Sequence, residues 1–185
     1  MNANVKKLLN VSVSVVFLWI TLFLPLKVAA SPYGLGLYDA NVPYGGATSL
    51  AISTTGNVAI QITPTDAGTL GTASNTVTVT SSDVVGYKLY ISSLSSTNMT
   101  NGVFTLPASA NVAAGALASN TWGYNTDASI NFIGMTASTV LIKSATGPFT
   151  AGSNTQVTYG VKVDNSKPAG SYATTVVYTA VPQTQ

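Results

Sequence analysis

Short runs of β-prone residues recur about every ten residues from residue 48 onward, and they constrain the fold more than any other feature of the sequence. Residues 76–80 alternate strictly, which predicts that Val77 and Val79 face inward and the threonines outward. The other runs that we predict as strands are 48–53, 57–62, 87–91, 138–143, 156–164 and 171–181. This rhythm is typical of an all-β fold, a single antiparallel β-sandwich, Ig-like or jelly-roll-like.

Apolar residues of the later runs also fall on single faces. The residues that we expect to face inward are Tyr87, Leu89, Ile91, Val157, Tyr159, Val161 and Val163. Asn101-Gly102 is the strongest hairpin signal, because a type I′ turn needs a positive φ at both central residues. Residues 108–119 have a helix-forming composition interrupted by Gly115, which predicts a single turn or a loop.

The N-terminus has the pattern of a secretory leader. Lys6 and Lys7 precede an apolar stretch at 11–26, and small residues at 28–30 form a cleavage site, so we expect an N-terminal signal helix in a signal peptide at 1–30. The alternative is an uncleaved anchor, in which the membrane is a partner only through this segment. We expect a secreted or cell-surface (extracellular) protein.

Residues 31–47 connect the leader to the strand-rich part and are dense in Gly and Pro, which disfavours a helix or a central strand. One interpretation is a flexible N-terminal arm that serves only as a linker to the β-sandwich domain at 48–185. The other is a donor strand that pairs with the sheet edge of another subunit, anchored by Tyr33, Leu35 and Leu37.

The chain contains no His, Cys, Arg or Glu, and this absence restricts its chemistry. It removes thiol chemistry, disulfides, the usual zinc ligands and a Ser-His-Asp arrangement, so we expect no enzyme, no cofactor and no metal site. After residue 30 four lysines face five aspartates, a net charge of −1, and no nucleic-acid partner is expected. Three alternatives remain: a calcium site formed by the scattered aspartates, a hydrolytic centre of Ser-Lys or Asp type, and a Lys–Asn isopeptide link through Lys88 or Lys162.

The sequence N-T-W-G-Y at 120–124 supplies the last candidate site. Trp122 and Tyr124 either stack on the ring of a glycan or pack in the core, where the indole N–H would find a carbonyl. The chain resembles small surface proteins that carry this motif, and the resemblance implies an exterior location.

Two further segments resemble exported bacterial β-sandwich proteins of the WxL-like and pilin-like kinds. The sequence K-P-A-G-S-Y at 167–172, followed by A-T-T-V-V-Y-T-A at 173–180, is similar to their closing turn and strand. The sequence G-Y-K-L-Y-I at 86–91 is similar to the first W-x-L motif, with Tyr87 in place of Trp. The resemblance implies an exported bacterial protein associated with the cell wall or the cell surface.

We therefore expect a secreted or cell-surface structural or adhesive protein that self-assembles into a layer or filament. Its partners would be copies of itself or other surface proteins. The alternative is a non-catalytic module that binds carbohydrate or cell wall.

Overall fold

The computed structural model describes residues 48–183, and within this range the secondary structure consists of strands with no helix. The strands are β1 (Ser49–Thr54), β2 (Thr69–Ser82), β3 (Gly86–Ser93), β4 (Met99–Asn101), β5 (Phe104–Leu106), β6 (Thr121–Asn125), β7 (Val140–Thr146), β8 (Phe149–Val163) and β9 (Val176–Gln183). The all-β prediction is confirmed for these residues. The predicted signal helix lies outside them.

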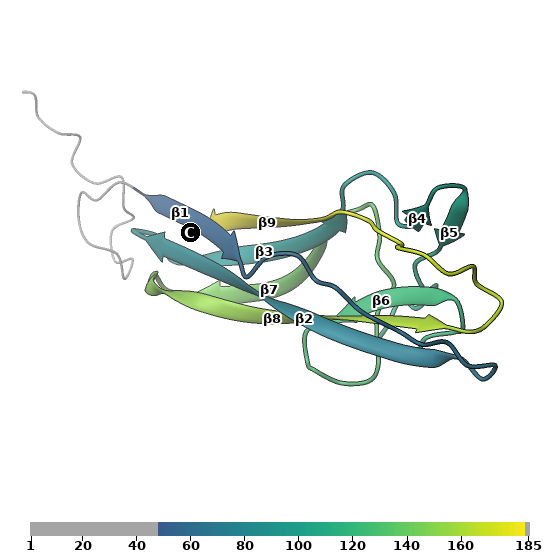
Figure 1. The fold of residues 1–185 in the computed structure, drawn as a ribbon. Coiled ribbons are helices and arrows are strands. Elements are labelled where there is room, and N and C mark those ends of the chain that lie inside the picture. The colour runs from purple at the N-terminus through teal and green to yellow at the C-terminus, as the bar shows by residue number, and fades with distance from the viewer. Residues whose placement is uncertain (1–47, 184–185) are drawn as a thin grey trace, which may run out of the picture. The chain divides into compact units, whose positions relative to one another are not determined.

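The strands form antiparallel sheets (Figure 1). One sheet has the order β1-β2-β8-β6, the second has the order β7-β3-β9, and β4 and β5 form a separate hairpin. The pairing of β2 with β8 is the longest in the larger sheet, and it runs from Thr69 opposite Val163 to Val79 opposite Ser153. A register shift beyond Val79 marks a β-bulge at its far end.

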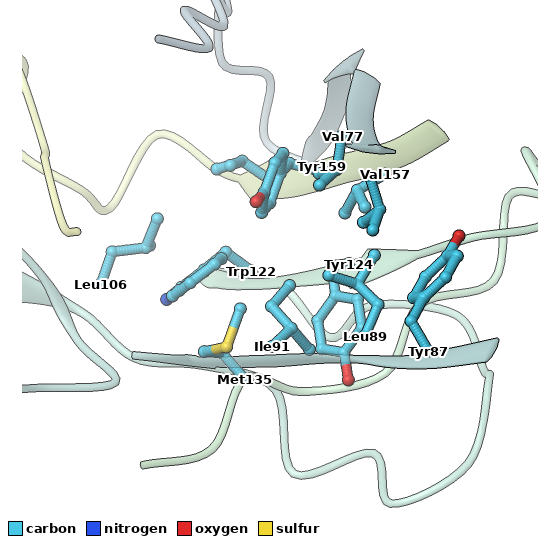
Figure 2. Packing of buried hydrophobic residues seen from close by; sticks show 12 residues of the cluster. Val77, Tyr87, Leu89, Ile91, Leu106, Trp122, Tyr124, Met135, Val157 and Tyr159 are labelled. Carbon is cyan, nitrogen blue, oxygen red and sulfur yellow. The ribbon is translucent and has the colours of Figure 1, made fainter. Parts of the chain in front are cut away.

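Both sheets contribute side chains to one hydrophobic core (Figure 2). Val77 and Val79 of β2 are fully buried, and the threonines between and beside them are half-buried or exposed, as the alternation predicts. The other inward-facing predictions are confirmed as well, since Val163 is half-buried and these residues are buried: Tyr87, Leu89, Ile91, Val157, Tyr159 and Val161.

The prediction of a strand at 57–62 is wrong. Thr55 N–H bonds to Thr76 O at 3.1 Å at the end of β1, and the following residues have no ladder partner. Their apolar side chains nevertheless pack against the core, and a Cβ on Gly71 would lie 2.5 Å from Ile62 Cγ1. The alternating pattern therefore reports one-sided burial of an extended segment, which does not require a hydrogen-bonded neighbour.

The closing strand begins later than the predicted range of 171–181. Strand β9 starts at Val176, because Ala173 is already paired in an isolated bridge with Thr100 of β4. Tyr172 therefore lies before the strand, although it still packs against the core.

The predicted hairpin forms, but it is centred one residue later than expected. Asn101 is the last residue of β4 and pairs with Phe104, which leaves Gly102 and Val103 as the two loop residues. Only Gly102 has a positive φ, at 58°, so the type I′ prediction is wrong and glycine in the first loop position fits the type II′ pattern.

A pair of glycines creates a slot on the side of the larger sheet away from the core. Gly123 of β6 lies directly opposite Gly160 of β8, and the fully buried ring of Phe132 fills the space that their missing side chains leave. A Cβ on Gly160 would lie 2.5 Å from Phe132 Cζ. The glycine of the W-G-Y sequence therefore lets Phe132 cover one side of β6, while Trp122 and Tyr124 enter the core on the other.

Replacing Gly160→Ala should lower the free energy of unfolding by about 1 to 3 kcal/mol, because the added methyl group overlaps the Phe132 ring. Gln156→Ala, at an exposed position on the same side of β8, is the matched control and should change it by no more than about 0.5 kcal/mol. Urea unfolding followed by tryptophan fluorescence measures both. Equal midpoints for the two variants would contradict the packing described.

Candidate functional site

Trp122 lies in the centre of the core (Figure 2). Its side chain is 0% exposed, and its Nε1–H donates to the backbone carbonyl of Thr97 at 2.8 Å. Its backbone is bonded on the outer side of β6, where its N–H donates to Pro107 O and its carbonyl accepts from Ser109 N–H. The ring therefore has no free face on which a sugar could stack.

Tyr124, the other aromatic residue of the motif, is 2% exposed. Burial raises the pKa of its phenol above the usual value, and its hydroxyl has no hydrogen-bond partner among the described residues. Like Trp122, Tyr124 is placed as a core residue. The candidate anchors of the arm, Tyr33, Leu35 and Leu37, lie outside the described residues.

A chain of hydrogen bonds between hydroxyl and amide groups connects the two sheets beside Trp122 and Tyr124. Tyr178 of β9 donates to Asn75 Oδ1 of β2 at 3.1 Å, and its hydroxyl also bonds to that of Tyr159 of β8. Because the Tyr178 proton is directed to Asn75, Tyr159 is the donor between the two phenols. Burial, together with the neighbouring Tyr178, raises the pKa of Tyr159 far above its usual range, and burial also raises that of Tyr178.

A second polar link brings a serine and a lysine together. Tyr87 OH donates to Ser153 Oγ at 2.8 Å, and Lys143 Nζ donates to the same oxygen at 3.0 Å and to Asn154 O at 2.8 Å. A Ser-Lys hydrolytic centre would need such proximity. Here the serine oxygen accepts two hydrogen bonds, which occupy both of its lone pairs, and it lies buried between the sheets. We assign it the role of a link between β3, β7 and β8.

The aspartates serve mainly in turns. Asp164 Oδ1 accepts hydrogen bonds from Ser166 N–H and from Asn120 Nδ2–H, both at 3.0 Å. Hydrogen bonds from Ser166 and Asn120 lower the pKa of this carboxyl below its usual value. Residues 48–183 contain no group of three or more potential metal-ligating His, Cys, Asp or Glu side chains. They also contain no helix long and apolar enough to cross a membrane.

Sequence reasoning did not find the two polar links, although it placed several of their members. It predicted that Tyr87 and Tyr159 face inward, and strict alternation along β8 also points Ser153 and Thr155 inward. A polar residue at an inward position usually has a buried partner. Ser153 has two such partners, whereas Thr155 Oγ1 has none among the described residues, so only Ser153 carried a usable signal. The partners on β7 and β9 depend on the strand order, which the sequence does not contain.

No protein-family profile, curated protein or solved structure matches this chain. The resemblance to WxL-like and pilin-like proteins accordingly stays a prediction that rests on short motifs.

The raised tyrosine pKa values predict a loss of stability at alkaline pH. Unfolded tyrosines ionise at about pH 10, whereas the buried phenol of Tyr159 and the half-buried phenol of Tyr178 resist ionisation. Their contribution to stability is therefore fully present below about pH 10 and falls as the pH rises above it. We expect the urea midpoint to decrease between about pH 9 and 11, and Tyr178→Phe to make this decrease shallower.

Tyr90→Phe is the control, because Tyr90 lies on the opposite face of β3 from the inward-facing Tyr87 and Ile91. It should keep the pH dependence of the unmodified protein. A midpoint that stays constant up to pH 11 would contradict the burial of the two phenols.

Proposed function

We propose that the chain is an exported surface protein of structural or adhesive type that acts by assembling with further copies of itself. The observation that carries this proposal is the surface of residues 48–183, which is nearly uncharged and exposes large apolar side chains. Four lysines and four aspartates give this part a net charge of zero. The most exposed apolar residues are Val112, Val103, Ile130 and Leu94, at 96%, 89%, 77% and 65%.

A neutral surface of this kind favours association. Copies approach without electrostatic repulsion, and contacts between apolar side chains remove their area from water. The two polar links support the same interpretation, because their hydroxyl groups bond within the fold, those of Tyr87, Ser153, Tyr159 and Tyr178. The chain then acts through its shape and surface.

The proposed fold of the assembling unit is a single β-sandwich. Its support is the shared core, to which Tyr87, Leu89 and Ile91 come from one sheet and Val77 and Val157 from the other. Export is supported by the leader pattern at 1–30.

The protein, expressed with its own leader and purified after export, should show an average mass that rises with concentration in sedimentation experiments. Negative-stain electron microscopy should show filaments or sheets. Raising the salt from about 0.05 to 0.5 M should not dissociate them, because the contacts are apolar and not ionic. A mass that stays monomeric at millimolar concentration, with no ordered assemblies in the images, would show that self-assembly is wrong.

A further inference from the structure

Of the outer edges of the two larger sheets in residues 48–183, that of β7 is the one to which no backbone hydrogen bond and no adjoining strand is assigned. β7 pairs only with β3, at one side of the order β7-β3-β9. In contrast, the outer edge of β6 bonds to residues 107–109 and to Ile133, and β1 lies beside β9 (Figure 1). An edge strand without a neighbour presents unpaired N–H and C=O groups to which another strand can bond.

The backbone groups available on this edge follow from the register. Gly147 N–H donates to Val85 O at 2.6 Å, so the antiparallel alternation makes Ala145 and Lys143 the next residues that bond to β3. Ser144 and Thr146 lie between them and direct their N–H and C=O groups away from β3. These groups are the template for an added strand.

The usual protection of an exposed edge is weak here. Natural sheets often place a lysine on such a strand, where its hydrated ammonium blocks further pairing. Lys143 is the only charged residue of β7, but its Nζ is held by Ser153 and Asn154 of β8. The remaining protection is a register shift opposite Leu89 and Tyr90, which leaves residues 143–146 regular.

The core beneath this edge is incompletely covered. Val140, Ile142 and Ala145 pack against the core cluster, yet each is only half-buried. A neighbouring strand with apolar residues on its inner face would complete their burial. The occupant must therefore alternate, with large apolar side chains on one face only.

On the basis of the self-assembly proposed above, we propose that residues 33–38 of a second copy add to β7 as an extra strand. This segment reads Y-G-L-G-L-Y, so as a strand it would place Tyr33, Leu35 and Leu37 on one face and Gly34, Gly36 and Tyr38 on the other. It carries no charge. Its apolar face matches the half-buried side of β7, and on the solvent side Tyr38 is the one large side chain beside the two glycines.

The length and origin of the arm suit a neighbouring molecule. Residues 31–47 number 17 and span up to roughly 60 Å when extended. They join the described fold at Thr48, whose Oγ1 donates to Asp83 O, at the same end where Gly86 pairs with Thr146 of β7. An arm that leaves one copy at this end can reach the β7 edge of the next.

The first test removes one backbone donor from the edge. Ser144→Pro loses only an outward N–H, so the fold should persist, but the concentration needed for assembly should rise by roughly tenfold or more. Thr54→Pro is the matched control, because Thr55 bonds to Thr76 and the N–H of Thr54 therefore points away from β2. It should assemble like the unmodified protein.

Leu35→Asp tests the arm without touching the described fold. It should block assembly as Ser144→Pro does, because a carboxylate would replace an apolar anchor over the core. The tryptophan emission spectrum of each variant should equal that of the unmodified protein, which verifies folding because Trp122 is fully buried.

Cross-linking tests the pairing directly, because the chain has no cysteine of its own. A Gly36→Cys copy and a Ser144→Cys copy of different mass, mixed under oxidising conditions, should give a disulfide-linked heterodimer, and Gly34→Cys and Tyr38→Cys scan the neighbouring registers. A double variant that forms the bond within one chain, or no cross-link at any arm position, would overturn the proposal. Filaments that form normally with Ser144→Pro would overturn it too while leaving self-assembly intact, whereas no assembly of the unmodified protein would overturn both.

Discussion

The packing of Trp122 between the two sheets is the interaction on which the rest of the structure depends. Its indole lies in the core with no exposed surface, and the N–H is bonded to the carbonyl of Thr97. Truncating a buried residue of this kind typically costs about 3 to 5 kcal/mol, a large share of the roughly 5 to 15 kcal/mol that stabilise a domain. Because the chain has no cysteine, no disulfide supplements this packing.

Polar groups inside the fold serve the same purpose. The Tyr159–Tyr178–Asn75 chain and the Tyr87–Ser153–Lys143 link both run between the sheets, and both satisfy groups that would be costly to bury alone. Their geometry holds strands at a fixed spacing. These two links direct several hydroxyl groups inward, and the surface left for function consists of edges, loops and mostly uncharged side chains.

Much of this fold could be predicted from strand alternation. The inward positions of β2, β3 and β8 follow from period-two patterns, because a residue that alternates with threonine or lysine must face the core. The segment at 57–62 misled for a physical reason, since burial of one face produces the same pattern without a ladder. The polar links depend on the strand order of both sheets and on how the sheets pack, which together bring Tyr178 of β9 to Asn75 of β2, 103 positions away in the sequence.

Our proposal that the chain acts by contact with further copies of itself is supported by the two polar links, whose hydroxyl groups bond within the fold. The most direct measurement is electron microscopy of native cells labelled with an antibody against residues 48–183. Our account predicts label in a continuous layer or along filaments on the outside of the cell. Label confined to the cell interior, or protein recovered only as a dispersed monomer in the medium, would contradict it.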